Sequence, residues 1–157
     1  MTKTVKRRRK EAKTDYKARL SLLKSNKPRL VVRKTNRYII SQIVESDIAQ
    51  DKTIVKATSK DLLGIGWPKE KSGSLKSLQA AYLTGFLLAK KAKGKVKEAI
   101  LDTGLQRTVH GSRIFAVVRG ALEAGLSIPH NKDALPSEKR LNSNERTSSL
   151  LKLKEKM

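Results

Sequence analysis

The 157-residue sequence contains no cysteine, which excludes disulfide bonds and thiolate metal sites. Histidine is almost as scarce: only His110 and His130 are present, and they lie too far apart to form a local metal-binding pair. We therefore expect no metal and no other cofactor.

The sequence also lacks an apolar run long enough to cross a membrane. Its most apolar stretch, residues 78–89, is interrupted by Gln79 and Thr84 and is shorter than the roughly 20 residues that a spanning helix needs. The basic N-terminus does not lead into the apolar core of a signal peptide. These two absences predict a cytoplasmic protein without a membrane partner.

Acidic residues are few: 14 Asp and Glu stand against 36 Lys and Arg, which leaves a formal net charge of +22. The excess is concentrated at one end, because residues 1–37 hold 15 basic and two acidic residues. A charge of this size destabilises a compact chain by self-repulsion, so its natural partner is a polyanion. Nucleic acid, an anionic membrane surface and an acidic protein are the candidates, and the membrane is the weakest of them.

The basic segment has two simpler explanations, a solubility tail and a nuclear-import signal. Neither explains why the positive charge continues to Arg37 with no acidic residue between Lys17 and Tyr38. This pattern favours nucleic acid. Because aromatic residues make up only 4 % of the chain, a platform of stacked bases is not expected, and shape and phosphate contacts should dominate, as for structured double-stranded RNA.

The sequence divides into four regions. They are a basic RNA-binding arm at 1–14, an N-terminal helix at 15–27, an α/β core domain at 28–130 and a polar C-terminal tail at 131–157. The arm has no hydrophobic periodicity, which predicts disorder in the unbound chain. Thr14 or Asp15 can cap the helix. The tail should lie on the surface or be disordered.

The core predicts a β-β-β-α-β-α order. Its elements are expected at 30–44 (a hairpin), 53–58 (a strand after a polar loop at 47–52), 75–93 (a helix after an irregular connector at 59–74), 98–102 (a strand) and 112–125 (a helix). The hairpin should turn at Thr35 and Asn36, where Asn tolerates the positive φ of a tight turn. Ser112 can cap the last helix, and residues 126–128 can add a final strand. The order predicts an α/β fold with helices packed on a mixed sheet.

This order is also the layout of ribonuclease H-like nucleases, which hold metal ions with carboxylates on the first strand, the first long helix and the fourth strand. Only Asp102 occupies such a position, and a lone Asp cannot hold two magnesium ions. Acyl transfer would have to use Ser112, His110 and Asp102, but a His-Gly-Ser sequence before a helix is more often a cap than a catalytic site. We therefore expect neither an enzyme nor a small-molecule substrate.

The hairpin carries one group of candidate RNA-binding residues. Alternation places Arg29 and Arg33 on one face and the core residues Leu30 and Val32 on the other. The cations that flank the turn are Arg33, Lys34 and Arg37. Tyr38 can stack on an unpaired base, or it can pack at the edge of the sheet.

The loop at residues 106–113 carries another group. Gly111 allows close backbone approach, and Ser112 begins a helix whose first N–H groups lack intrahelical partners. Two flanking arginines add charge beside the positive end of the helix dipole, so the loop should bind a phosphate. His110 can donate to that phosphate or bond within the loop. The alternative is an ordinary capped turn, with Ser112 bonded to its own helix. All residues expected to contact RNA are Lys6, Arg7, Arg8, Arg9, Lys10, Lys13, Tyr16, Arg19, Arg29, Arg33, Lys34, Thr35, Asn36, Arg37, Tyr38, Arg107, His110, Gly111, Ser112 and Arg113.

Four stretches of the sequence resemble one protein family: RRRKEAKTDYKARLSLLKSNKPRLVVRKTNR (7–37), AAYLTGFLLAKK (80–91), ILDTGLQRT (100–108) and GSRIFAVVRGALEAGLSIPHN (111–131). They are similar to the archaeal and eukaryotic branch of the 5S rRNA-binding large-subunit ribosomal protein eighteen. They follow one another in order between residues 7 and 131. Eukaryotic members carry a much longer C-terminal extension, so the chain looks archaeal.

The resemblance implies a translational-machinery α/β fold, no catalysis, and a seat on 5S rRNA in the central protuberance of the large ribosomal subunit. It also implies contacts with 23S rRNA and with neighbouring ribosomal proteins, including the one of the fifth family. The alternative, from another class, is a free RNA-binding regulator or RNA chaperone that uses the same basic surface on varied RNAs.

Overall fold

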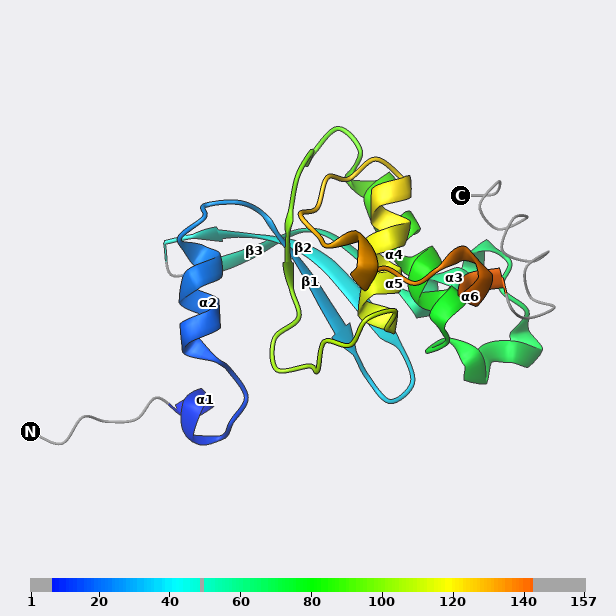
Figure 1. Cartoon of the computed structure of the whole chain (residues 1–157), viewed down its shortest axis with the longest axis horizontal. Coiled ribbons are helices and arrows are strands. Elements are labelled where there is room, and N and C mark those ends of the chain that lie inside the picture. Colours follow the sequence, from blue (N-terminus) through cyan, green and yellow to red (C-terminus); the bar gives the residue numbers. More distant parts are fainter. Residues whose placement is uncertain (1–6, 49, 143–157) are drawn as a thin grey trace, which may run out of the picture.

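The structure is a computed structural model that describes residues 7–48 and 50–142 (Figure 1). Its elements begin with two short helices in the basic N-terminal region and end with a short helix that follows the core. In chain order they are α1 (Arg7–Lys10), α2 (Tyr16–Leu23), β1 (Arg29–Lys34), β2 (Ile39–Asp47), β3 (Gln50–Thr58), η1 (Ser59–Asp61), α3 (Leu62–Ile65), η2 (Lys69–Ser74), α4 (Leu78–Ala92), β4 (Ile100–Asp102), α5 (Arg113–Glu123), η3 (Lys132–Ala134) and α6 (Glu138–Asn142).

Four strands form one mixed sheet in the order β3-β2-β1-β4. β1 pairs antiparallel with β2 and parallel with β4, and β2 pairs antiparallel with β3. A parallel pair requires a crossover connection, and α4 lies in the connection between β3 and β4. The α/β class, the mixed sheet and the β-β-β-α-β-α order predicted from the sequence are therefore confirmed.

α4 and α5 pack against each other and against the sheet (Figure 1). Leu30 of β1 lies in the buried core, as the alternation predicts. The two helices approach closely because glycine stands at both contact points. A Cβ atom at Gly85 would lie 2.0 Å from the backbone oxygen of Val117, and one at Gly120 would lie 2.0 Å from that of Tyr82. A side chain at either glycine would force the close-packed helices apart.

The connection between β1 and β2 differs from the predicted turn. It spans residues 35–38 and is closed by Thr35, whose hydroxyl donates to the Tyr38 carbonyl at 2.8 Å and accepts from the Tyr38 N–H at 2.9 Å. Asn36 does not adopt the positive φ expected of it. That prediction is wrong because a threonine-closed loop of this length reverses the chain without a left-handed residue.

The β2–β3 hairpin is longer than predicted. The polar segment 47–52, expected as a loop, contains the end of β2 and the start of β3. These strands pair from Ile40 and Thr58 at one end to Asp47 and Gln50 at the other. The first four residues of β3 are exposed, so polar side chains suit this outer part of the sheet.

Side-chain caps set the starts of two helices. Asp15, one of the two expected caps of α2, accepts from the N–H groups of Lys17 at 2.9 Å and Ala18 at 3.1 Å. Ser77 accepts from the Ala80 N–H at 3.2 Å and therefore starts α4 later than the expected residue 75. None of the described helices is long and apolar enough to cross a membrane.

The last described residues pack on the core, although residues 131–157 were expected to form a tail. Leu141 of α6 is 6 % exposed, and its carbonyl accepts from the Gln79 side chain at 3.1 Å. The strand expected at 126–128 is reduced to one parallel bridge between Ser127 and Glu98. The rest of the expected tail, residues 143–157, lies outside the described residues.

Candidate nucleic-acid interface

Asp102, the last residue of β4, holds two arginines of β1. The parallel register places it opposite Val31, between Arg29 and Arg33. Its Oδ2 accepts from Nη1 of Arg29 and its Oδ1 accepts from Nη2 of Arg33, both at 2.8 Å. Nη1 of Arg33 also donates to the Asp102 carbonyl at 2.7 Å. One carboxylate is therefore shared by two residues that the sequence assigns to RNA.

Arg29 is buried, which contradicts its predicted contact with RNA. Its side chain is 3 % exposed. Its Nη2 donates to Oδ1 of Asp51 at 2.9 Å and to Oγ of Ser46 at 3.0 Å. A buried guanidinium requires partners of this kind, and here they all belong to the chain itself. The strand pattern assigns its face correctly but does not reveal the carboxylates that pair with it.

Asp51 of β3 attaches α2 to the sheet. Its Oδ2 accepts from Nη2 of Arg19 at 2.8 Å, and its Oδ1 accepts from the Ser46 hydroxyl at 2.6 Å as well as from Arg29. Burial raises the pKa of Asp51, but hydrogen bonds from Ser46, Arg19 and Arg29, together with the charge of Arg29, outweigh it and lower the pKa from 3.8 to about 2. Arg19 and Tyr16, two predicted RNA contacts on α2, are both half-buried.

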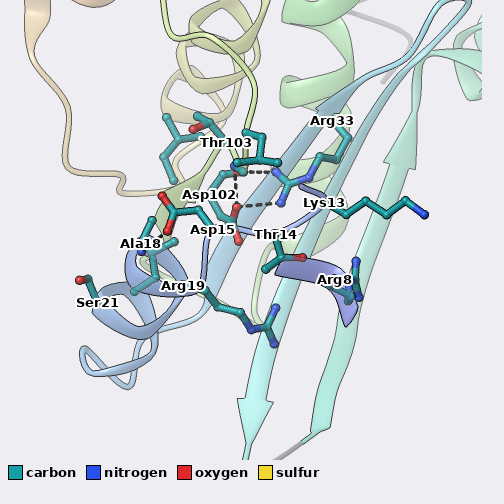
Figure 2. Close-up of a pocket in the computed structure, with 14 residues that line it drawn as sticks. Arg8, Lys13, Thr14, Asp15, Ala18, Arg19, Ser21, Arg33, Asp102 and Thr103 are labelled. Atoms are coloured by element: carbon teal, nitrogen blue, oxygen red, sulfur yellow. Dashed lines mark hydrogen bonds and ion pairs between the residues drawn. The ribbon is translucent and has the colours of Figure 1, made fainter. Parts of the chain in front are cut away.

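A hollow of about 470 Å³, which we call the α2 hollow, opens between the N-terminal helices and the segment after β4 (Figure 2). Figure 2 shows Arg33 reaching from β1 to Asp102 at its edge. The lining combines four cations, two carboxylates and several apolar side chains. It consists of Arg8, Lys13, Thr14, Asp15, Ala18, Arg19, Ser21, Leu22, Arg33, Leu101, Asp102, Thr103, Gly104 and Leu105.

The segment after β4 is fastened to β1. The Gln106 side chain accepts from the Lys34 N–H at 3.1 Å and donates to the Lys34 carbonyl at 2.9 Å. The Gly104 N–H donates to Oδ1 of Asp102 at 2.9 Å. A Cβ atom at Gly104, where φ is +59°, would lie 3.0 Å from the guanidinium carbon of Arg33. Glycine therefore lets this loop lie directly against the Arg33 guanidinium.

A second hollow of about 500 Å³, which we call the α5 hollow, lies at the start of α5. It brings Lys34 of β1 together with the predicted loop and adds Arg140, which the sequence does not predict as a site residue. None of the described residues that line it is Asp or Glu, so its positive charge is suited to an anion. The lining consists of Lys34, Ser77, Leu78, Arg107, Val109, His110, Gly111, Ser112, Arg113, Ile114 and Arg140.

Ser112 occupies the N-cap position of α5, but its hydroxyl makes no capping bond. Among the residues that the structure describes, Oγ of Ser112 is buried without a hydrogen-bond partner. The first hydrogen bond within the helix runs from the Ala116 N–H to the Ser112 carbonyl at 2.9 Å. The N–H groups that precede Ala116 in this turn therefore have no acceptor within the helix. The alternative of an ordinary turn capped by Ser112 is therefore wrong.

Gly111 lines the α5 hollow, but its N–H is used within the chain and is not left for a ligand. Its φ of +65° requires glycine, but the residue is buried and its N–H donates to the Ala134 carbonyl at 2.8 Å. A Cβ atom here would lie 2.6 Å from Nη1 of Arg140. The close approach that glycine allows is made by the chain itself, which folds back over the loop.

The β1–β2 turn exposes Lys34, Asn36 and Arg37. Thr35 is also exposed and closes the turn. Tyr38 is half-buried and packs against the hydrophobic core, which is the packing alternative stated for it above. Cations, rather than an aromatic ring, therefore dominate this end of the hairpin.

The described part of the N-terminal arm begins with the short helix α1, which ends at Lys10. All four residues of α1 are exposed, and Arg7 and Lys13 pair with Glu11 at 3.7 and 2.7 Å. Residues 7–13 thus have more structure than the expected disordered arm, although exposed ion pairs contribute little to stability. Lys6, the first residue of the predicted contact set, lies outside the described residues.

Comparisons with known proteins identify the family of this basic chain. Residues 2–99 and 93–131 match the family described as ribosomal large subunit proteins 60S L5 and 50S L18. The chain belongs to this family. The resemblance drawn from the four sequence stretches is confirmed, and so is the expected place among proteins of the large ribosomal subunit in the cytoplasm.

Relatives of this ribosomal protein are named large ribosomal subunit protein uL18. The one from Korarchaeum cryptofilum is 49 % identical over 150 residues, covering 95 % of this chain and 75 % of the relative. The one from Methanoculleus marisnigri is 52 % identical over 136 residues, covering 86 % and 75 %. The one from Methanospirillum hungatei is 50 % identical over 135 residues, covering 85 % and 75 %. These relatives agree with the archaeal character expected from the sequence.

Three residues that shape the surface of this ribosomal protein are absent from the predicted site: Asp102, Asp51 and Arg140. For Asp102 a signal exists, because an acid at the end of a strand can pair with basic residues of a neighbouring strand. Asp51 falls in a predicted loop and Arg140 in a predicted tail, so neither has a predictable neighbour. The described residues contain no group of three or more His, Asp or Glu that could hold a metal ion.

Proposed function

We propose that this large-subunit ribosomal protein binds 5S rRNA, contacts 23S rRNA and helps to anchor 5S rRNA in the central protuberance. Neighbouring ribosomal proteins, including the one of the fifth family, would be its protein partners. Family membership and the net charge of +22 support an RNA-bound structural role. The α5 hollow is the observation on which the proposal chiefly depends.

The α5 hollow has the chemistry of a phosphate site. Lys34 of β1 joins Arg107 and Arg113 of the loop before α5, and all three line one depression at the N-terminus of that helix. The free N–H groups and the positive end of the helix dipole favour an anion there. The unpartnered hydroxyl of Ser112 can donate to a phosphate oxygen. Phosphates of a folded RNA are the dense, fixed anions that such a depression fits.

The N-terminal region would add binding that depends little on RNA sequence. The exposed cations of α1 are suited to contacts with the phosphates of the RNA backbone. We assign the contacts of residues 1–14 and 15–27 to this role, and the shaped contacts to the core at 28–130. Deleting residues 1–14 should therefore weaken binding and flatten its salt dependence while the core still folds.

The arrangement of Asp102 supports a role without catalysis. It is the carboxylate at the nuclease-like position, and both of its oxygens are engaged by Arg29 and Arg33. Binding a magnesium ion there would take from the buried Arg29 one of its two carboxylate partners. The same pairing keeps Asp102 from orienting His110 toward Ser112.

The proposal is tested by filter binding of the full chain to 5S rRNA and to an unrelated folded RNA of equal length, over a range of salt concentrations. We expect tighter binding to 5S rRNA, with a steep salt dependence. Equal affinity for both RNAs would contradict the proposal and favour the free RNA chaperone. A second measurement separates the two functions: a ribosomal protein should remain stoichiometric with the large subunit after a high-salt wash, whereas a chaperone should be released.

A further inference from the structure

The α2 hollow differs chemically from a phosphate site. The carboxylates of Asp15 and Asp102 line it and would repel a phosphate placed inside. Arg33, the cation at its edge, is already paired with Asp102 at 2.8 Å. Little uncompensated positive charge is therefore left in the interior of the hollow.

One wall of the α2 hollow is apolar. Leu22 comes from α2, and Leu101 and Leu105 come from β4 and the loop that follows it. Leu105 is 57 % exposed, so its apolar side chain is open to contact from solvent. The volume of about 470 Å³ lies within the range of about 300–1,000 Å³ that is typical of small-ligand sites. The hollow thus offers room and an apolar surface for a flat ligand.

Arg33 presents a fixed planar group at the same place. Its guanidinium donates to the carbonyls of Val32 and Asp102 and to the Asp102 carboxylate, at 2.9, 2.7 and 2.8 Å. Gly104 lies against it. The side chain is nevertheless 37 % exposed, so part of it can be reached from solvent. A guanidinium that cannot rotate is a stacking surface for a nucleic-acid base.

Cations occur where the helices border the hollow. Arg8 of α1 and Lys13 line it, and both are exposed. Exposed cations can contact the phosphates on either side of a base that has entered. The carboxylate of Asp15 is an acceptor, and the Thr103 hydroxyl can donate or accept, so both suit the polar edge of a base.

We propose that the α2 hollow receives one unpaired nucleotide of the bound RNA. Its base stacks on the Arg33 guanidinium beside Leu101 and Leu105, and its flanking phosphates contact Arg8 and Lys13. This inference rests on the proposed function insofar as the nucleotide belongs to 5S or 23S rRNA. Binding of a nucleotide in the α2 hollow, however, can be tested without either RNA.

The test fills the hollow without changing its charge. Ala18 is an exposed residue of α2 that lines the hollow, so Ala18→Trp should fold and block it. Leu20→Trp is the matched control, because Leu20 is on the same helix, is 56 % exposed and does not line the hollow. Circular dichroism should show the same helix content for both variants and the wild type.

The first measurement uses small probes. The full chain is titrated with each of the four nucleoside 5′-monophosphates, with inorganic phosphate as a separate probe, while the methyl NMR signals of Leu101 and Leu105 are followed. We expect at least one nucleotide to shift these signals in the wild type and in Leu20→Trp but not in Ala18→Trp. No shift with any nucleotide, or the same shift with inorganic phosphate, would overturn the proposal.

The second measurement uses 5S rRNA. Ala18→Trp should lower the affinity roughly tenfold with an unchanged salt slope, because it removes base stacking and no phosphate contact. Chemical probing of the bases should show one unpaired nucleotide that is protected by the wild type and by Leu20→Trp but exposed with Ala18→Trp. Nucleotide binding without 5S rRNA binding would disprove the proposed function but would still support the α2 hollow as a nucleotide site. Equal 5S rRNA affinity and protection for both variants would refute a role of the hollow in that complex.

If Ala18→Trp unfolds, Leu105→Ala replaces it. Leu105 is more than half exposed, so shortening it should not damage the core. The variant removes apolar wall and leaves every charge in place. Loss of the nucleotide-induced shift at Leu101 supports the proposal, and an unchanged shift contradicts it.

Discussion

The α2 hollow and the α5 hollow are similar in size, at about 470 and 500 Å³, yet they differ in charge compensation. The α2 hollow contains two carboxylates, and two of its arginines are paired with acids of this chain. The α5 hollow has no Asp or Glu among its described lining residues. The cations of a basic protein thus serve two purposes: some hold the fold together, and others remain for the polyanion.

Neighbouring residues of β1 illustrate this division. Arg33 lines the α2 hollow and Lys34 lines the α5 hollow, because successive side chains of a strand point in opposite directions. Arg33 is paired with Asp102, whereas Lys34 is exposed. The number of cations in a segment therefore overestimates its number of RNA contacts. Four predictions test this contrast.

The largest effect should come from Asp102→Ala. The substitution leaves the buried guanidinium of Arg29 with one carboxylate partner fewer and releases Arg33. Breaking a buried ion pair on one side costs about 3–5 kcal/mol, so the free energy of unfolding should fall by roughly that amount. Urea denaturation measures it. The exposed Asp133 supplies the control Asp133→Ala, which should change stability little. Equal stability losses for the two variants would show that the α2 hollow does not depend on its internal ion pairs.

The second prediction concerns the α5 hollow. Replacing Arg107 and Arg113 with Ala should leave stability nearly unchanged but weaken 5S rRNA binding by roughly tenfold or more. If each arginine neutralises one phosphate, the slope of log K against log salt should fall by about 1.4–1.8. Filter binding over a salt series measures both effects. Lys60→Ala with Lys69→Ala removes two exposed cations elsewhere, and this control should affect binding less. An equal loss in both double variants would mean that net charge matters and the hollow does not.

The sequence allows much of the α5 hollow to be predicted, because Arg107, His110 and Arg113 are close in the chain and precede a recognisable helix start. That prediction does not include the bond from the Gly111 N–H to the Ala134 carbonyl. A residue with positive φ can be recognised from glycine and its context, but what lies against it depends on the later segment at 134–140. Local sequence therefore predicts the loop, but it does not predict the segment that packs over the loop.

The α2 hollow could not be predicted in the same way. It requires α2, the end of β4 and Arg33 of β1 to meet, and these segments lie far apart in the chain. Alternation and the β-β-β-α-β-α order predict the core face of β1 and the sheet correctly. They do not reveal that Asp51 and Asp102 form ion pairs with arginines that were expected to contact RNA. Ion pairs across strands depend on the register of the strands, which these patterns do not give.

A smaller effect is expected from acid. The pKa of Asp51 is lowered in the folded chain to about 2 from 3.8, so its contribution to stability is complete above about pH 5 and is lost as the pH falls toward 2. Asp51 is 33 % exposed, so solvent screening limits the contribution to roughly 1 kcal/mol. Urea denaturation at pH 6 and pH 3 should show a smaller pH-dependent loss for Asp51→Asn than for the wild type.

Another carboxylate serves as the internal reference for that experiment. Burial by itself would raise the pKa of Asp61, but hydrogen bonds from Thr58 and the charge of Lys91 outweigh burial and lower the pKa. The contribution of Asp61 to the stability of the fold is therefore also lost in acid. Asp61 titrates in both proteins and cancels in their difference. Identical acid profiles for the wild type and Asp51→Asn would mean that the link between α2 and β3 carries no net stabilisation.

The smallest effect should come from Gln106→Ala, and it tests whether the two hollows are coupled. Gln106 makes two hydrogen bonds to the backbone of Lys34 and so fastens the segment whose start lines the α2 hollow and whose end lines the α5 hollow. Because these bonds are near solvent, their loss should cost only about 0.5–1.5 kcal/mol. If the segment is a shared wall, hydroxyl-radical footprints on 5S rRNA should weaken at the contacts of both hollows, although neither loses a charge. The exposed Gln50 supplies the control Gln50→Ala, which should leave the footprints unchanged. Weakening at one site alone would mean that each hollow is held in shape by its own contacts and that the two are not coupled through this segment.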